Sequence, residues 1–204
     1  MPSFQVLSWP AAIGNARACA KVIWMLINGV LREKMGLLDL RVDSAFDRLR
    51  GKRSLDVLFY GASAIGDHGA LWVLVSVLRG VQPKHRLRAK RTIVAAGIES
   101  VFVNLLLKSL FKRSRPSNDG PHPLPLRIPR TSSFPSGHTT AAFCAATLLA
   151  EGDPLWPAYY AMASVVAASR IYVRLHHASD VLAGVALGSA LGRIGRRLVP
   201  LERS

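Results

Sequence analysis

Residues able to bind and transfer a phosphoryl group occur in three short strings of this sequence. In chain order, the strings are Lys108-x6-Arg115-Pro116, Pro135-Ser136-Gly137-His138 and Ser169-Arg170-x5-His176-x3-Asp180. An arginine binds phosphate through a planar fork of donors, and a lysine binds it as a point charge. An imidazole can attack phosphorus or carry a proton to the leaving oxygen. The three strings together therefore predict chemistry at a phosphate group.

The spacing within the first two strings predicts where their side chains lie. Lys108 and Arg115 are seven residues apart, about two helical turns, so a helix ending at Arg115 would present both on one face. Ser136 and Gly137 stand at an expected helix start, where backbone N–H groups bind anions, and His138 follows as a candidate general acid. Taken alone, each string is also typical of a solvated cationic helix end or an ordinary helix cap.

The third string adds a candidate nucleophile. His176 and Asp180 are four residues apart, on one face of an expected helix start. A carboxylate that binds one imidazole nitrogen leaves the other nitrogen as a nucleophile with a defined tautomer. Arg170, six residues before His176, can supply a third cation. By itself, the His-Asp pair would also fit a simple hydrogen-bonded surface pair.

The elements that must position these strings are predicted to be membrane helices. Half of the residues are hydrophobic, and they cluster in long runs that charges rarely interrupt. The runs predict an all-α, multi-pass membrane helical bundle with about five to six transmembrane helices and an N-terminal amphipathic helix. The expected helices are an interfacial helix or poor span at 10–32, a charged surface helix within 33–54, Leu55–Leu78 interrupted at Gly66–Gly69, Thr92–Phe111, and about 136–152, 155–173 and 177–195.

Loops and regions follow from the same pattern. Residues 82–91 are predicted to form a short basic loop, and the proline-rich residues 112–134 a longer one. We therefore expect an N-terminal interfacial region at 1–54, a membrane-embedded core at 55–198 and a tail at 199–204. Glu99, in an otherwise apolar span, is expected to turn inward and to be paired.

The charge balance indicates the kind of partner. Lys and Arg number 27 against 12 Asp and Glu, a formal net charge of +15. In a hydrophobic chain, such a charge favours anionic lipid headgroups or phosphorylated substrates. Nucleic acid is disfavoured because the basic residues flank apolar spans without interleaved aromatic residues. The expected partners are a lipid phosphate substrate and the bilayer, and no protein partner is predicted.

The three strings resemble, without a departure, the signature motifs of the type 2 phosphatidic acid phosphatase and vanadium haloperoxidase superfamily. The resemblance extends over about residues 92–195. It implies that His176 attacks phosphorus and forms a phosphohistidine, that Asp180 orients His176, and that His138 protonates the leaving group. It also implies a set of phosphate-binding residues, namely Lys108, Arg115, Ser136, Gly137 and Arg170. No metal or other cofactor is expected, because these cations supply the charge that Mg²⁺ supplies in other phosphoryl-transfer sites.

The expected activity is that of an integral membrane lipid phosphatase, a metal-independent hydrolase of phosphate or diphosphate esters. The expected substrate is a polyprenyl diphosphate, a polyprenyl-phosphate derivative or a phosphatidate-type lipid, with an isoprenoid carrier such as undecaprenyl diphosphate slightly favoured. One alternative is a vanadate-dependent haloperoxidase-type oxidoreductase, which the hydrophobic spans disfavour. Another is a non-enzymatic phospholipid-binding membrane protein, which the intact catalytic residues disfavour.

Location and headgroup contacts are further expectations. The resemblance implies a bacterial plasma membrane with an extracytoplasmic active site, and the basic loop 82–91 and the Arg-rich C-terminus would then lie inside. His122, Arg127 and Arg130 lie in the proline-rich loop between the first two strings and are candidate contacts to a lipid headgroup.

Overall fold

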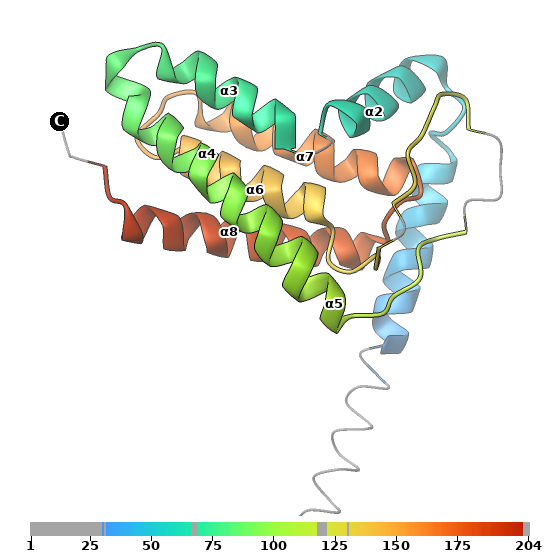
Figure 1. The fold of residues 1–204 in the computed structure, drawn as a ribbon. Coiled ribbons are helices and arrows are strands. Elements are labelled where there is room, and N and C mark those ends of the chain that lie inside the picture. The colour runs from blue at the N-terminus through green and yellow to red at the C-terminus, as the bar shows by residue number, and fades with distance from the viewer. Residues whose placement is uncertain (1–29, 31, 67–68, 118–121, 130, 202–204) are drawn as a thin grey trace, which may run out of the picture. The chain divides into compact units, whose positions relative to one another are not determined.

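The computed structural model describes residues 30, 32–66, 69–117, 122–129 and 131–201, and these residues form helices and loops without a strand (Figure 1). The predicted all-α class is therefore confirmed. The chain divides into two units, Met1–Leu40 and Arg41–Ser204. Residues 30 and 32–40 of the first unit are helical. Most of the amphipathic segment predicted at 10–32 lies outside the described residues, and the predicted boundaries after residues 54 and 198 remain predictions.

The second unit contains the three strings. It begins with helical residues 41–47, and its further elements are α2 (Arg53–Ile65), α3 (Ala70–Gly80), the 3-10 helix η2 (Pro83–His85), α4 (Arg86–Val101), the π-helix η3 (Phe102–Leu107), α5 (Lys108–Leu110), α6 (Gly137–Leu149), α7 (Trp156–Tyr172) and α8 (Ala178–Leu198). The break expected at Gly66–Gly69 separates α2 from α3. Gly69 has a φ of 69°, a left-handed conformation that glycine adopts without steric cost.

Two sequence-based boundaries were wrong. Residues 86–91, predicted as part of a basic loop, form the first turns of α4. Arg91 is buried there because its guanidinium donates to the carbonyl oxygens of Leu148 and Val199. Of the two helix ends that the sequence suggested, Phe111 and Arg115, the second is wrong: the helix ends at Leu110, and beyond it the Ser133 N–H donates to the Arg113 carbonyl.

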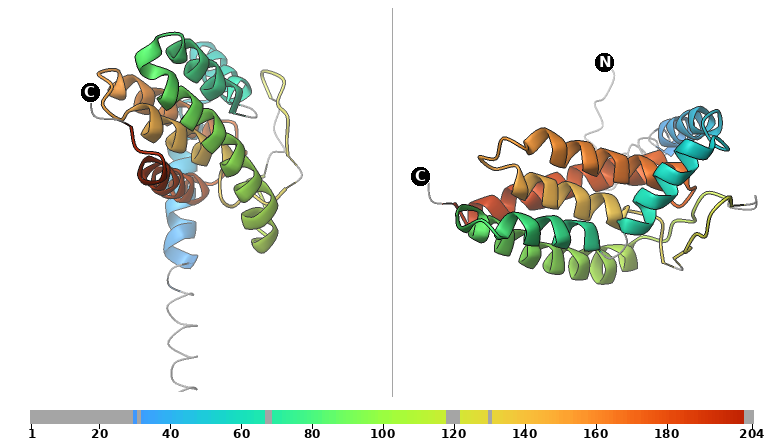
Figure 2. Two further views of the ribbon diagram at one scale, coloured as in Figure 1. Left: turned by 60° about the vertical axis from the view of Figure 1, so that its left-hand side comes forward. Right: turned by 90° about the horizontal axis from the view of Figure 1, so that it is seen from above.

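Helix α6 is the centre of the bundle. It packs against α4, α7 and α8, while α2 packs against α7 and α3 against α4 (Figures 1 and 2). Nine of the thirteen residues of α6 are buried. Gly184, Gly188 and Gly192 of α8 lie against α6, and a Cβ added at Gly188 would lie 2.3 Å from the Thr140 carbonyl oxygen. Glycine at this four-residue spacing lets the backbones of α6 and α8 come into close contact.

A buried carboxylate joins the helices at the end of the bundle away from the three strings. Asp153, in the loop between α6 and α7, accepts hydrogen bonds from Arg79 at 2.5 Å and from Arg88 at 3.0 Å. Burial alone would raise the pKa of Asp153, but the Leu155 N–H and the two guanidinium groups hold it below its ordinary value. Asp153 therefore connects α3 and α4 to the loop before α7.

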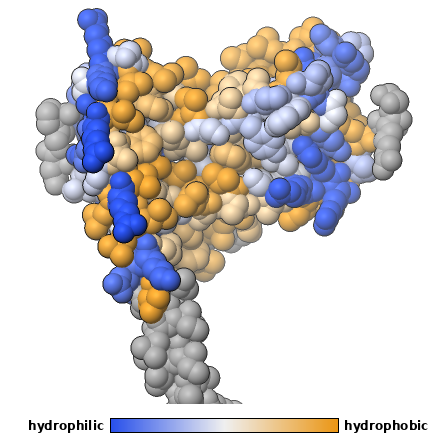
Figure 3. Space-filling view, turned by 180° about the vertical axis from the view of Figure 1, so that it is seen from behind, coloured by the Kyte–Doolittle hydropathy of each residue, from blue (hydrophilic) through white to orange (hydrophobic). Residues whose placement is uncertain are grey.

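The outer surface of several helices is apolar. Large hydrophobic side chains are exposed on α2, α3, α4 and α8, among them Val57, Leu58, Leu74, Leu78, Val94, Ile98, Leu182 and Ile194. Figure 3 shows hydrophobic residues over the middle of one face of the molecule. In the described part of the chain, length and hydropathy qualify no helix on its own as a span, whereas α2 and α3, bent by 75°, qualify as a pair. The expected number of five to six spans remains a prediction.

Candidate active site

Residues from all three strings line one cavity. The cavity has a volume of about 640 Å³ and lies among α3, α4, α6, the end of α7 and the loops that follow α5 and α7. It is lined by six of the eight residues predicted to bind phosphate or act in catalysis, namely Lys108, Arg115, Gly137, His138, Arg170 and His176. The remaining two, Ser136 and Asp180, are fully buried beside it.

The hydrogen bonds of His176 define its tautomer. His176 lies in the loop between α7 and α8, and its Nδ1 is 2.7 Å from the Ser133 carbonyl oxygen, which can only accept. Its Nε2 is 3.3 Å from Nη1 of Arg115, which can only donate. The proton is therefore on Nδ1 and the lone pair on Nε2. Burial, reinforced by Arg170 and Arg115, lowers the pKa of His176 from 6.5 to about 3, so the ring is neutral near pH 7.

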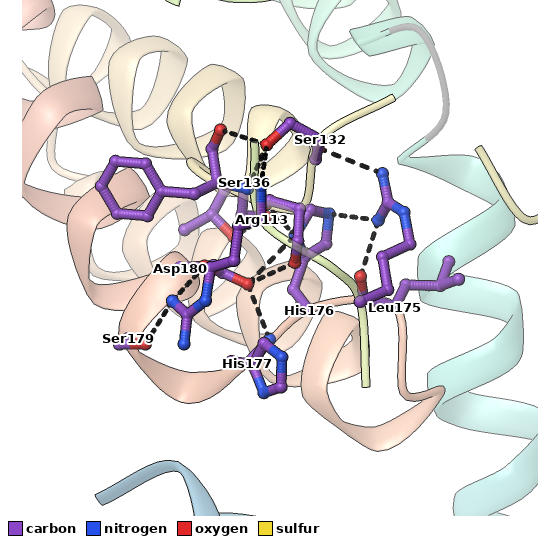
Figure 4. A network of polar contacts seen from close by, with 12 residues as sticks. Arg113, Ser132, Ser136, Leu175, His176, His177, Ser179 and Asp180 are labelled. Carbon is purple, nitrogen blue, oxygen red and sulfur yellow. Dashed lines mark hydrogen bonds and ion pairs between the residues drawn. The ribbon is translucent and has the colours of Figure 1, made fainter. Parts of the chain in front are cut away.

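Asp180 supports His176 less directly than its spacing predicts. His176 precedes α8 instead of belonging to its first turn, and the Asp180 carboxylate is 3.8 Å from Nδ1, too far for a hydrogen bond. Asp180 Oδ2 accepts instead from the Ser133 hydroxyl at 2.5 Å and from the His177 N–H at 2.9 Å (Figure 4). Its Oδ1 accepts from Arg113 at 2.6 Å. Asp180 therefore fixes the loop whose carbonyl holds the imidazole.

Arg115 connects the loops around the cavity. Its Nε donates to the Pro129 carbonyl at 3.1 Å, and its Nη1 donates to the Leu175 carbonyl at 2.6 Å as well as facing His176. Its Nη2 faces the carbonyls of Thr131 and Ser132 at 3.1 and 3.4 Å. These contacts engage every N–H of the guanidinium, so a phosphate group must replace at least one of them to be bound by Arg115.

The second string forms the start of α6, as expected. Ser136 is the N-cap, and His138 lies in the first turn and lines the cavity. The Ser136 hydroxyl is directed away from the cavity, because it hydrogen-bonds to the Thr139 hydroxyl at 2.9 Å and has no exposed surface. Gly66, between α2 and α3, lies against the imidazole: a Cβ there would be 3.4 Å from Cδ2 of His138. The break between α2 and α3 thus leaves room for this histidine.

Lys108 and Arg170 approach the cavity from two different helices. Lys108 begins α5, directly after the π-helix. Arg170 lies in the last turn of α7 with 1% of its surface exposed, and its Nη1 donates to the Ser63 hydroxyl of α2 at 2.5 Å. The cations of all three strings are therefore delivered to one volume, although Lys108 and Arg115 do not share a helix face.

The three residues predicted to contact a lipid headgroup lie in different places. Arg127 lines the active-site cavity. His122 lines a different cavity and hydrogen-bonds through Nδ1 to the Tyr60 hydroxyl at 3.0 Å. Arg130 lies outside the described residues. Of the three, Arg127 is the one that the structure brings to the active-site cavity.

Sequence reasoning missed two residues of this site. Arg113 binds the buried Asp180, and Ser133 contributes both a carbonyl to His176 and a hydroxyl to Asp180. Arg113 lies inside the spacer of the first string, where nothing distinguishes it from its neighbour Lys112. Ser133 belongs to a serine pair just before the second string. That position, next to a string predicted to bind phosphate, was the available signal.

An apolar helical bundle that gathers cations and a neutral histidine around one cavity defines a membrane enzyme acting on phosphate groups. A comparison with known proteins shows the family to which it belongs. The sequence profile of the PAP2 superfamily matches residues 90–203, and the chain belongs to this superfamily.

Individual relatives are bacterial phosphatases. Decaprenylphosphoryl-5-phosphoribose phosphatase from Mycobacterium tuberculosis is 32% identical over 137 residues, which cover 66% of this chain and 75% of that protein. Lipid A 1-phosphatase from Porphyromonas gingivalis is 45% identical over 69 residues, 31% of this chain and 16% of that protein.

Two solved structures share the fold. LpxE from Aquifex aeolicus has a TM-score of 0.63 and 28% identity, and the match covers 78% of this chain and 94% of that one. A transmembrane PAP2-type phosphatidylglycerolphosphate phosphatase from Bacillus subtilis has a TM-score of 0.61 and 22% identity, with 82% and 93% covered. The predicted family and the all-α fold of this class of membrane phosphatase are therefore confirmed, whereas the number of spans remains a prediction.

Proposed function

We propose that this PAP2-type membrane lipid phosphatase hydrolyses its substrate through a phosphohistidine on Nε2 of His176. The observation that carries the proposal is the neutral ring whose lone pair is on Nε2, in a cavity that also contains Lys108, Arg115 and Arg170. A neutral, desolvated imidazole is a nucleophile without first losing a proton. Nearby cations lower the barrier by stabilising negative charge that develops on the phosphoryl oxygens.

The reaction then has two balanced steps. In the first, His176 Nε2 forms a bond to phosphorus while the bond to the lipid oxygen breaks, and His138 donates a proton to that oxygen. In the second, water attacks the phosphohistidine, His138 takes a proton from the water, and the P–N bond breaks. The products are the dephosphorylated lipid and inorganic phosphate, and both histidines return to their starting states.

The supporting residues act on charge and geometry. Lys108, Arg115, Arg170 and the N-terminus of α6 at Gly137 surround the transferred phosphoryl group and stabilise its charge. When the phosphate binds, it replaces at least one hydrogen-bond acceptor of Arg115. If it replaces Nε2 of His176, the nucleophilic nitrogen is freed. Asp180 holds its loop in place and offsets the positive charge that forms on the imidazole during attack.

The proposed substrate is a lipid phosphate in a bacterial plasma membrane, with the active site on the extracytoplasmic side. The Mycobacterium tuberculosis relative is a decaprenylphosphoryl-5-phosphoribose phosphatase, which favours a polyprenyl-linked phosphate as the substrate here. Exposed cations at the opposite end of the bundle, including Lys84, Arg86 and Lys90, favour a cytoplasmic position for that end.

Phosphate release from a panel of lipid phosphates in detergent, with EDTA present, tests this function. The wild-type protein should release phosphate, and His176→Ala and His138→Ala should each abolish release. His122→Ala is the matched control, because it removes a histidine that lies outside the active-site cavity. Full activity of His176→Ala would refute the assignment of the nucleophile, and peroxide-dependent halide oxidation with vanadate would favour the oxidoreductase alternative.

A further inference from the structure

The active-site cavity contains a carboxylate that the proposed mechanism does not use. Glu99 of α4 lines the cavity, has 4% of its surface exposed, and has an enclosed Oε1 without a hydrogen-bond partner. The sequence predicted that this side chain turns inward, which is correct, and that it is paired, which is wrong for Oε1. An enclosed carboxylate oxygen without a partner is destabilising, and this points to a group that binds there during function.

The position of Glu99 along α4 relates it to the parts of a lipid substrate. The cavity is apolar at Ile93, Ala96 and Gly97 of α4 and cationic at Lys108. With a rise of 1.5 Å per residue, Ile93 precedes Glu99 by about 9 Å, and Lys108 follows it by about 13.5 Å. If a lipid binds with its phosphate at Lys108 and its tail along the apolar part, the segment that joins the phosphate to the tail lies next to Glu99.

The π-helix explains how Glu99 and Lys108 come to line the same cavity. Nine residues of regular α-helix would place them half a turn apart, on opposite faces. The π-helix η3, Phe102–Leu107, lies between them and accommodates about one extra residue in its turn, which brings the two positions to within about a quarter turn. Interruptions of this kind occur preferentially at functional sites.

We propose that Glu99 is a specificity-determining residue that accepts a hydrogen bond from a hydroxyl group on the segment joining the scissile phosphate to the lipid tail. This inference rests on the proposed function. A carboxylate is an acceptor only, so it matches a sugar or glycerol hydroxyl. It repels a second phosphate at the same place, so Glu99 selects a phosphate monoester of a hydroxyl-bearing lipid over a polyprenyl diphosphate.

A role in positioning Lys108 is the competing explanation. The two charges are close enough to interact electrostatically, but within the described residues no hydrogen bond or ion pair joins them. If Glu99 acted only through Lys108, its replacement would slow every substrate by the same factor, because every substrate brings a phosphate to Lys108. Selection by a hydroxyl contact instead changes the ratio between substrates.

A matched pair of substrates separates these explanations. Lysophosphatidate carries a free hydroxyl beside the phosphate-bearing carbon, its 2-deoxy analogue lacks only that hydroxyl, and farnesyl diphosphate carries a second phosphate. Wild type should prefer lysophosphatidate over the analogue by about 10- to 100-fold in kcat/KM, the range expected for a hydrogen bond to a charged group. It should act on farnesyl diphosphate more slowly than on either monophosphate.

Two variants and a control complete the test. Glu99→Leu should remove the hydroxyl preference, and Glu99→Gln, which keeps an acceptor oxygen without the charge, should raise activity on farnesyl diphosphate by about tenfold. Glu151→Gln is the control, because Glu151 lies by the Asp153 loop and pairs with Arg91 away from the cavity. Equal wild-type rates on the matched pair, or one common factor of loss for all substrates in both Glu99 variants, would overturn the inference. No phosphate release from any substrate would overturn the proposed function and this inference with it.

Discussion

The most direct test of how this site works is Asp180→Asn, which removes one charge and keeps the shape of the side chain. Asp180 is fully buried and accepts hydrogen bonds from Ser133, His177 and Arg113. It does not hydrogen-bond to His176, whose Nδ1 lies 3.8 Å from Oδ2. Its largest effect on catalysis is therefore electrostatic, and appears when the imidazole becomes positive during attack on phosphorus.

The magnitude follows from this distance. Two unit charges 3.8 Å apart attract by about 4 kcal/mol at an effective dielectric constant near 20. Since about 1.4 kcal/mol corresponds to a factor of ten in rate, Asp180→Asn should lower kcat by about 1000-fold. The loss of a buried ion pair should also destabilise the fold by a few kcal/mol, because Arg113 is left without its carboxylate.

Asp153→Asn is the matched control for this experiment. Asp153 is equally buried and also pairs with arginine, at 2.5 Å, but lies at the opposite end of the bundle. Both variants should unfold at lower temperature than wild type, as measured by thermal unfolding in detergent. Phosphate release by the folded fraction should fall in Asp180→Asn alone. Equal kcat in both variants, or a loss smaller than tenfold in Asp180→Asn, would refute an electrostatic role for Asp180.

Three further variants test packing, protonation and phosphate binding. Gly188→Ala places a methyl group 2.3 Å from the Thr140 carbonyl and should lower stability by about 1–3 kcal/mol in thermal unfolding, whereas Gly61→Ala, with open space around it, should not. The lowered pKa of His176 gives stability that is present above pH 6.5 and is lost as pH falls towards 3, so His176→Gln should flatten the acid side of the unfolding profile. Arg115→Lys keeps the charge but loses the fork of donors, and kcat/KM should fall about 100- to 1000-fold.

The sequence predicted the helices of the second half well because their signals are local. Proline and glycine mark the turns around α6, α7 and α8, and glycine recurs at four-residue spacing on the face of α8 that packs on α6. The cationic start of α4 was predicted as a loop because a high density of charge in the sequence does not show which groups bind the charged side chains in the fold. Arg88 and Arg91 are accommodated in a helix by carbonyl and carboxylate groups that lie far away in sequence.

Which residues belong to the site was also predictable from the sequence, but the contacts between those residues were not. Spacing placed His138 at a helix start, as found, and the structure brings Lys108, Arg170 and His176 to the same cavity. The sequence suggested two ends for the preceding helix, Phe111 and Arg115, and spacing alone did not show that Arg115 reaches the cavity from a loop. A motif specifies the identity of side chains, whereas this arrangement depends on backbone hydrogen bonds between loops that are distant in sequence.

The backbone bonds also explain why the nucleophile is held by a carbonyl instead of by its neighbouring carboxylate. A carboxylate in direct contact with Nδ1 would stabilise the imidazolium, and protonation would remove the lone pair that attacks phosphorus. The Ser133 carbonyl at 2.7 Å fixes the same tautomer with a weaker attraction for charge. Asp180 accepts a hydrogen bond from the Ser133 hydroxyl instead of from the imidazole, and its negative charge still stabilises the positive charge that forms later in the reaction. The site thus keeps His176 neutral at rest and stabilises it once it has attacked.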